Sequence, residues 1–182
     1  MTSLTRPDVA LHASLAEAMA EFGEEFPHGS GIWHFAEGES VDLTEAGCRD
    51  FVAELLRYAD RNQSLPEDRV HCDYLWITDG PATVVGFLAL RHELNAWLLE
   101  EGGHIGYSVR PSRRREGHAT RALALSLRRA AELGIERALV TCDDDNEASA
   151  RTIERNGGVY EDTRNGKRRY WITTPTGAVG AA

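Results

Sequence analysis

Cysteine is scarce in this 182-residue chain, and its three copies stand far apart. Cys48, Cys72 and Cys142 are odd in number and lack the spacing of metal ligands, which argues against a disulfide framework and against a zinc site. We therefore expect no metal cofactor and a reducing, cytoplasmic setting.

Long hydrophobic runs are missing as well. No apolar stretch has the length that a membrane-spanning helix needs. Residues 1–8 carry no basic run followed by an apolar segment, as an export signal would. We expect no membrane association and no export.

Positive charge is in deficit, with 20 Lys and Arg against 29 Asp and Glu and a formal net charge of -9. General nucleic-acid binding is not expected, because phosphates are neutralised by an excess of Lys and Arg. The deficit is uneven: residues 1–109 hold 6 basic and 19 acidic residues, whereas residues 110–182 hold 14 and 10. An anion would dock on the second part, although ordinary variation in surface charge is the alternative.

Length and hydrophobic periodicity indicate one α/β domain. Helices are predicted over residues 8–22, 44–59, 119–133 and 147–156, and strands over 74–78, 84–91, 104–109, 137–141, 159–163 and 167–172. Turn sequences at 79–81 and 164–166 predict two hairpins. Asp42 with Glu45 resembles a capping box for the second helix.

Three segments outside these elements carry no periodic pattern. Residues 27–35 and 93–103 are predicted to be irregular, and the first of them is a candidate cover for a site. The chain after Thr173 is predicted to be a mobile tail. The domain is thus placed at residues 1–173 and the tail at residues 174–182.

The turn after the 104–109 strand has the features of an anion site. The first N–H groups of a helix lack intrahelical partners, and the helix dipole adds partial positive charge there. Arg113, Arg114 and Arg115 stand just before Gly117, which has no side chain to obstruct an anion. Phosphate binding is predicted, with a solvated basic turn as the alternative.

Two motifs in register resemble those of the GNAT acetyltransferase superfamily. Arg114-x-x-Gly117-x-Ala119 is similar to its pyrophosphate-binding motif, Arg/Gln-x-x-Gly-x-Gly/Ala. Asn146-x-x-Ser149 looks like its second motif, in which the Asn contacts the pantetheine arm, although an Asn here is also typical of a helix cap. The stretches 100–107 and 141–146 look like those of a little-characterised bacterial branch of predicted acetyltransferases.

This resemblance implies a single GNAT-like α/β (α+β) domain. A mixed central sheet of six to seven strands would be flanked by helices, and acetyl-CoA would bind where two strands splay apart. The implied reaction moves the acetyl group directly to a primary amine of a small molecule or peptide. The implied coenzyme-binding residues are Val109, Arg114, Arg115, Gly117, His118, Ala119, Thr120, Asn146 and Ser149.

The chain departs from the family pattern at one catalytic position. Many GNAT enzymes carry a Tyr seven residues after the motif Asn to protonate the thiolate, and here that residue is Ile153. Tyr107 is the candidate replacement, with core packing as the alternative. His104 is the candidate base and His92 a second one, with a structural or exposed histidine as the alternative for each.

The acceptor is less well defined. Acidic residues at 100–101 and 143–145 would attract a cationic amine, with solvated loop charge as the alternative. A covalent route through Cys142 would need an activating base that the sequence does not identify, so direct transfer is expected.

Two other functions stay open. A regulatory or sensor module that binds acyl-CoA without turnover would account for Ile153. A polyanion-binding protein could use residues 113–115 and 167–169, but the net charge opposes it. A homodimer is compatible with the sequence.

Overall fold

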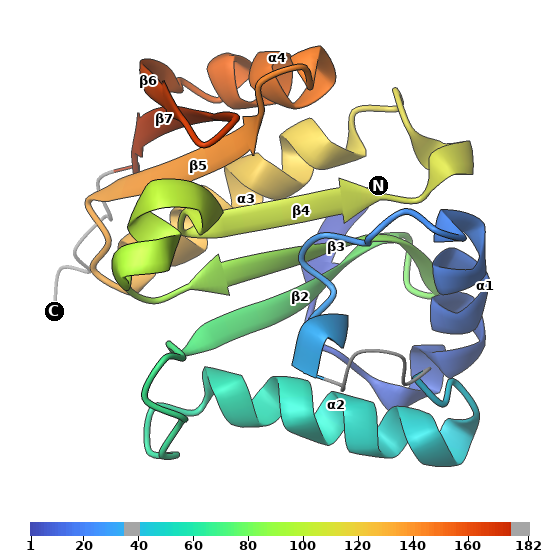
Figure 1. The fold of residues 1–182 in the computed structure, drawn as a ribbon. Coiled ribbons are helices and arrows are strands. Elements are labelled where there is room, and N and C mark those ends of the chain that lie inside the picture. The colour runs from blue at the N-terminus through green and yellow to red at the C-terminus, as the bar shows by residue number, and fades with distance from the viewer. Residues whose placement is uncertain (35–40, 176–182) are drawn as a thin grey trace, which may run out of the picture.

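Seven strands form one mixed sheet in the computed structural model, which describes residues 1–34 and 41–175 (Figure 1). The strand order is β1-β2-β3-β4-β5-β7-β6. All neighbouring strands are antiparallel except β4 and β5, which are parallel. The strands are β1 (Thr2–Thr5), β2 (Cys72–Asp79), β3 (Thr83–Arg91), β4 (Ile105–Val109), β5 (Arg137–Asp143), β6 (Val159–Arg164) and β7 (Lys167–Thr173).

Helices cover both faces of this sheet (Figure 1). The α-helices are α1 (His12–Phe22), α2 (Glu45–Ala59), α3 (His118–Glu132) and α4 (Glu147–Arg155), and short 3-10 turns occur at η1 (Val9–Leu11), η2 (Ile32–His34) and η4 (Pro111–Arg113). Apolar side chains of α1 and α2, such as Leu15 and Phe51, pack on one face. Those of α3 and α4, such as Leu123 and Ile153, pack on the other face.

Both predicted hairpins are present. In the second hairpin the turn residues Asn165 and Gly166 have φ values of 49° and 73°, the left-handed conformation that an Asn-Gly pair favours. Strand β1 was not predicted from the sequence; it pairs with β2 from Thr2 opposite Asp79 to Thr5 opposite Trp76. Four residues are too few for an alternating pattern to show.

The start of α2 differs from the prediction. Its cap is Thr44, whose Oγ1 accepts a hydrogen bond from the amide of Gly47 at 3.2 Å. Asp42 instead accepts from the amide of Thr44 at 2.9 Å, one residue outside the helix. The prediction of an Asp42–Glu45 box is therefore wrong, because the side chain that reaches the first turn is that of Thr44.

Parts of two segments that were expected to be irregular or mobile are ordered. Within residues 93–103 lies a π-helical turn, η3 (Leu98–Gly102), whose end is fixed by the Gly103 amide donating to the Leu98 carbonyl at 2.7 Å. Thr174 is buried and donates from its hydroxyl to the Ile135 carbonyl at 2.7 Å, so it belongs to the fold and not to a tail. Residues 176–182 of the predicted tail lie outside the described residues. None of the helices in the described ranges combines the length and apolarity needed to cross a membrane.

Candidate active site

The parallel strands β4 and β5 diverge directly after their first contact. Within the described residues, one register pair joins them, Ile105 opposite Val140. The Arg91 amide donates to the His104 carbonyl and the Arg110 amide to the Val85 carbonyl, so the backbone of every second β4 residue faces β3. Antiparallel alternation then turns the backbone groups of Tyr107 and Val109 toward β5. The splayed strand pair that the resemblance implied is present.

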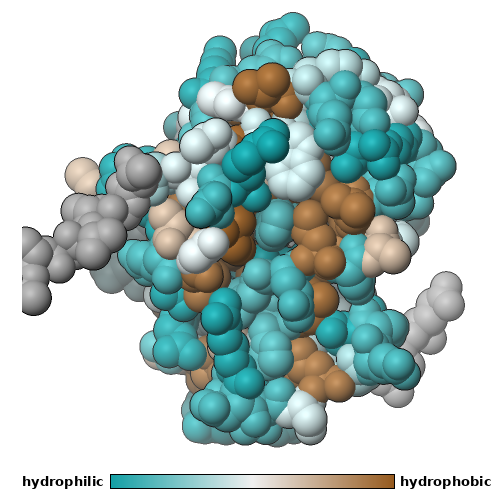
Figure 2. Space-filling view, turned by 90° about the vertical axis from the view of Figure 1, so that its left-hand side faces the viewer, coloured by the Kyte–Doolittle hydropathy of each residue, from teal (hydrophilic) through white to brown (hydrophobic). Residues whose placement is uncertain are grey.

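A cavity of about 870 Å³ opens at this gap. Tyr107, Cys142, Asn146 and Ser149 line it where β4, β5 and α4 meet, and the remaining walls come from residues 26–33, 68–74, 89–91 and 95–106, with parts of β5 and β7. On the side of the molecule that carries η3, hydrophobic side chains interrupt the hydrophilic surface (Figure 2). Trp97 in this segment lines the cavity and is 57% exposed, so the cavity has an apolar rim.

The loop of residues 27–31 lies directly on β3 and β4. Gly29 has a φ of +86°, and a Cβ there would sit 2.6 Å from the Gly106 carbonyl oxygen and 2.9 Å from the Leu88 Cα. Only glycine permits so close an approach. The Ser108 hydroxyl donates to the His28 carbonyl at 2.7 Å. The loop is thereby fixed on β3 and β4, where it lines the cavity. Its role as a cover stays a prediction.

This loop brings His28 into the cavity wall. Partial burial lowers the pKa of the His28 imidazole from its usual value, and the nearby cations Lys167 and Arg91 lower it further. The lowered pKa favours the neutral ring, which is able to accept a proton. His28 was not predicted from the sequence, because no motif or periodicity marks it. The glycine-rich loop around it was the available signal.

Tyr107 reaches from β4 to the first turn of α4. Its hydroxyl lies 2.9 Å from the Ser149 Oγ, and burial raises the pKa of Tyr107 to about 12, so the phenol stays protonated at neutral pH. The Ser149 amide donates to the Asn146 Oδ1 at 3.0 Å, so Asn146 caps α4 as predicted. Burial raises the pKa of the Cys142 thiol, which makes it a weak nucleophile.

Ile153 and His104 lie away from this constellation. Ile153 is fully buried in the core between the sheet and α4, so a Tyr-like role is not available there. His104 is buried, its Nδ1 accepts from the Leu139 amide at 2.9 Å, and its ring contacts Trp171. Burial, together with the Arg91 cation, lowers the pKa of His104 to about 4. The cavity lining does not include His104.

His92, the second candidate base, belongs to a polar cluster outside the cavity. Its Nε2 lies 2.9 Å from the Asp73 Oδ1, and the other oxygen of Asp73 accepts from Arg129 at 2.8 Å. Hydrogen bonds from His92 and Arg129 lower the pKa of Asp73 despite its burial. His92 thus has a structural position.

The predicted anion site occupies the start of α3. Gly117, with a φ of 87°, is the cap residue, and the first intrahelical bond runs from the Arg121 amide to the Gly117 carbonyl at 3.0 Å. The amides of His118, Ala119 and Thr120 are therefore the ones that a helix leaves free for a ligand.

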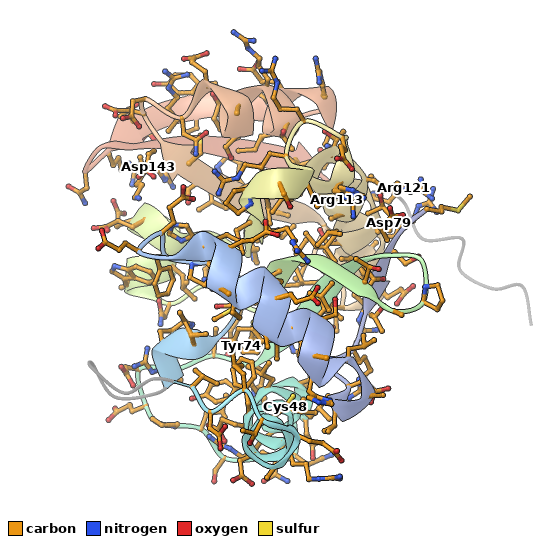
Figure 3. The ribbon with its side chains drawn as sticks, turned by 90° about the vertical axis from the view of Figure 1, so that its right-hand side faces the viewer. Cys48, Tyr74, Asp79, Arg113, Arg121 and Asp143 are labelled. Atoms are coloured by element: carbon orange, nitrogen blue, oxygen red, sulfur yellow. The ribbon has the colours of Figure 1, made fainter. Side chains whose placement is uncertain are left out.

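The three arginines before α3 have different surroundings. Arg113 donates to Asp79 at 2.8 Å and to Glu116 at 2.9 Å, and Figure 3 shows it beside Asp79. Arg114 donates from Nε to the Val109 carbonyl at 3.0 Å and pairs with Glu25. Arg115 is exposed and has a φ of 67°. Arg113 and Arg114 thus hold the loop in place. Arg115, two residues before Gly117, is exposed to solvent.

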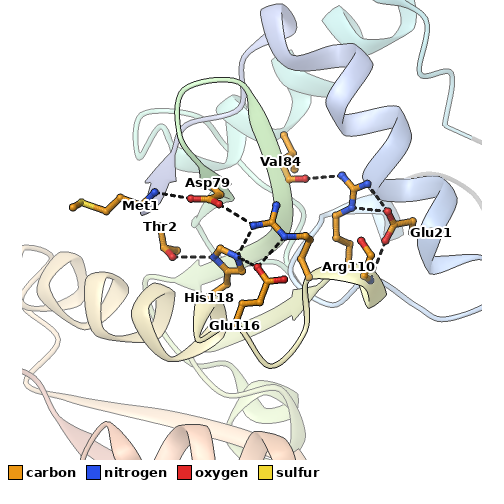
Figure 4. A network of polar contacts seen from close by, with 10 residues as sticks. Met1, Thr2, Glu21, Asp79, Val84, Arg110, Glu116 and His118 are labelled. Carbon is orange, nitrogen blue, oxygen red and sulfur yellow. Dashed lines mark hydrogen bonds and ion pairs between the residues drawn. The ribbon is translucent and has the colours of Figure 1, made fainter.

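The side chain of His118 also has a structural position (Figure 4). Its Nδ1 lies 2.9 Å from the Thr2 Oγ1 and its Nε2 lies 3.2 Å from Glu116, so it ties β1 to the start of α3. Of His118, only the backbone amide is available to a ligand. In the same region Glu21 of α1 pairs with Arg110, which lowers the pKa of Glu21 to about 2 and fixes the end of β4.

Comparison with known proteins gives one family. The model of the acetyltransferase (GNAT) domain matches residues 13–159. No curated protein matches the chain. In the parts of the chain that the structure describes, no group of three His, Cys, Asp or Glu side chains is placed to hold a metal ion.

Several solved structures share the fold. RimJ of Mycobacterium smegmatis in complex with CoA-disulfide is 18% identical, with 94% of this chain and 81% of that chain covered and a TM-score of 0.68. RimL, a ribosomal L7/L12 α-N-protein acetyltransferase in complex with coenzyme A, is 16% identical, with 96% and 95% covered and a TM-score of 0.65. The microcin C7 self-immunity acetyltransferase MccE, in complex with acetyl-CoA and AMP, is 16% identical, with 94% and 92% covered and a TM-score of 0.64.

Proposed function

We propose, from the premise that this chain belongs to the GNAT acetyltransferase family, that it moves the acetyl group of acetyl-CoA directly to a primary amine of a small molecule or peptide. Family membership confirms the expected class, an acetyl-CoA-dependent acetyltransferase. The identity of the acceptor and the positions of both substrates are proposals. The observation that carries them is that the cavity meets the gap between β4 and β5 at Tyr107 and Ser149.

The coenzyme is proposed to lie along the gap. Backbone groups of Tyr107 and Val109 face that gap and would bond the pantetheine arm, as Asn146 would from the other side. The amides of His118, Ala119 and Thr120 would hold the pyrophosphate. Arg115 would supply the positive charge, because Arg114 already pairs with Glu25 and bonds the Val109 carbonyl.

His28 is proposed as the general base in place of His104. It lines the cavity and its lowered pKa keeps it neutral, so it can take the proton that the amine loses as the new C–N bond forms. The gap-facing amides of β4 would stabilise the oxyanion. When the C–S bond breaks, Tyr107 would give its proton to the thiolate, and Ser149 would hold the phenol in place.

A peptide amine is among the proposed acceptors, because RimL is named as an α-N-protein acetyltransferase. The sensor alternative predicts binding of acetyl-CoA without transfer to any amine. The protonated Tyr107 at the gap favours turnover, because it supplies the acid that Ile153 cannot.

The test combines coenzyme binding with an amine panel. Gly117→Glu should weaken acetyl-CoA binding about 10-fold or more, because the new carboxylate would meet the phosphates at the start of α3. Calorimetric titration with acetyl-CoA measures the affinity, and thiol release across amino acids, peptides, polyamines and aminoglycosides measures transfer.

Gly134→Glu is the matched control. Gly134 also has a positive φ, 83°, and open space around its Cβ position, but it lies after the opposite end of α3. If the two variants bind acetyl-CoA with equal affinity, the phosphate site does not lie at the start of α3. Tight binding of acetyl-CoA with no thiol release on any amine would show that the protein is an acyl-CoA sensor and not an enzyme.

A further inference from the structure

Among the Asp, Glu, Lys and Arg side chains that line the cavity, two lack a partner of opposite charge in the described residues. The charged lining residues are Asp68, Arg69, Arg91, Glu101, Asp143 and Lys167. Asp68 pairs with Arg69 at 3.6 Å, and Lys167 pairs with Asp143. Glu101 accepts one hydrogen bond from the Asn165 amide group at 3.2 Å, and within residues 1–34 and 41–175 neither Glu101 nor Arg91 forms an ion pair.

Arg91 is held at one nitrogen and open at the others. Its Nη1 donates to the carbonyls of Gly102 and Gly103 at 2.8 and 3.2 Å. No side chain or carbonyl in the described part of the chain accepts from its Nε or Nη2. A guanidinium has five N–H donors in a fixed fork, so one edge of this fork is left for a ligand.

The position of this fork is close to the expected reaction centre. A Cβ on Gly106 would lie 3.5 Å from Nη1 and 3.7 Å from Nη2 of Arg91. Gly106 precedes Tyr107 on β4, where the strands separate, and its missing side chain leaves the guanidinium uncovered. An anionic group bound by Arg91 would therefore stand near the amine that attacks the thioester.

We propose that the acceptor carries a carboxylate a few bonds from its amine and that Arg91 binds this carboxylate through Nε and Nη2. The proposal rests on the function proposed above, which places the amine at the gap. The planar fork of Arg matches a carboxylate at two oxygens. Glu101 would face the ammonium group of the arriving substrate, so that both unpaired charges of the cavity are matched.

The acceptor class that follows is an amino acid or a peptide with an acidic first residue. Both present an amine and a carboxylate within a few bonds. The acidic runs in the sequence predicted a cationic amine, but Asp143 is already paired with Lys167, and Glu100 with Arg164. The cavity therefore suits a zwitterion better than a cation.

The experiment compares amines that differ only in the carboxylate. One arm uses L-phenylalanine against phenethylamine, and the other uses the peptide Asp-Ala-Ala-amide against Asn-Ala-Ala-amide. Wild type should prefer the carboxylated member of at least one pair. Arg91→Gln should lower kcat/KM for that member about 10- to 100-fold and leave the other member within about 3-fold.

Two further variants separate recognition from structural damage. Arg91→Lys keeps the charge without the fork and should retain part of the preference. Arg69→Gln removes a cation of the same cavity that is already paired, and should change both members of a pair by the same factor. An equal loss for both members in Arg91→Gln, or a wild type without preference, would overturn the proposal.

A binding measurement distinguishes this inference from the proposed function. The carboxylated amines are titrated into the enzyme with coenzyme A bound. Arg91-dependent binding without any transfer would refute the transferase function and keep the carboxylate site. Transfer that does not depend on the carboxylate would refute the carboxylate site and keep the transferase function. If neither Arg91-dependent binding nor transfer is observed, both proposals are rejected.

Discussion

The coenzyme end and the acceptor end of the proposed site are built in different ways. The coenzyme end uses two contiguous segments, residues 107–120 and 146–149, and most of its proposed groups are backbone groups of β4 and backbone amides at the start of α3. The acceptor end is a cavity whose walls come from many separate segments, and its chemistry lies in side chains such as His28, Arg91 and Tyr107.

This difference in construction predicts that phosphate binding at the coenzyme end tolerates changes in the neighbouring side chains, whereas selection of the acceptor depends on individual side chains. Amides at a helix start bind phosphate whatever the neighbouring side chains are, so a short motif is sufficient. Acceptor selection depends on a few side chains placed by loops, which tolerate change without loss of the fold. Variants of the two ends should therefore separate coenzyme affinity from turnover.

The largest expected effect at the acceptor end comes from His28→Gln. Loss of the base should lower kcat about 100-fold or more, while acetyl-CoA affinity stays within about 3-fold. Because the His28 pKa is lowered, wild-type kcat should rise with pH through a midpoint below about 6.5 and reach a plateau above it. A pH–rate profile at saturating amine measures this limb, which the variant should lose.

His71→Gln is the control for that prediction. His71 is another partly exposed histidine, its Nε2 donates to the Gln63 carbonyl at 3.1 Å, and it does not line the cavity. Its replacement should leave the profile unchanged. An intact acidic limb in His28→Gln would assign the proton transfer to another group or to water.

A smaller effect is expected for Tyr107→Phe, which removes one hydroxyl and keeps the ring. We expect kcat to fall about 10-fold at unchanged coenzyme affinity. Ser149→Ala should cost less, because it keeps the phenol itself and removes only the hydroxyl that orients it. Since the Tyr107 pKa is raised to about 12, wild-type kcat should show no alkaline decline from this group up to about pH 10. Stopped-time assays of thiol release check both points, and a wild-type rate in Tyr107→Phe would exclude the phenol as the acid.

The sequence predicted the features that depend on local pattern. The four α-helices, the two hairpins and the cap at Asn146 follow from periodicity and turn residues, which act over a few positions. Strand β1 and the turn η3 escaped because four or five residues give no periodic signal, and both depend on pairing with distant residues.

The site shows the same division. Gly117 and Asn146 could be placed at the starts of their helices from spacing alone, because a cap position depends only on the backbone of its own helix. His28 could not, since its position depends on Gly29 resting against Gly106, nearly eighty residues later in the chain. His104 looked like a base from its place on β4, but the Leu139 amide and burial determine its environment.

The smallest effect on turnover is expected for His104→Asn, which sharpens the distinction between the cavity and the strands around it. Asn can still accept from the Leu139 amide, but it cannot take up a proton. The His104 pKa of about 4 lies below the unfolded value of about 6.5, so the unfolded chain binds the proton first as pH falls. Its contribution to stability is therefore complete above pH 6.5 and is lost between pH 6.5 and 4, by roughly 3 kcal/mol in total.

Urea unfolding at pH 7, 5.5 and 4 should show a shallower loss of unfolding free energy in the variant than in wild type, with kcat at pH 7.5 within about 2-fold. A large loss of kcat with an unchanged stability profile would return the base role to His104, and with it would move the reaction centre away from the cavity.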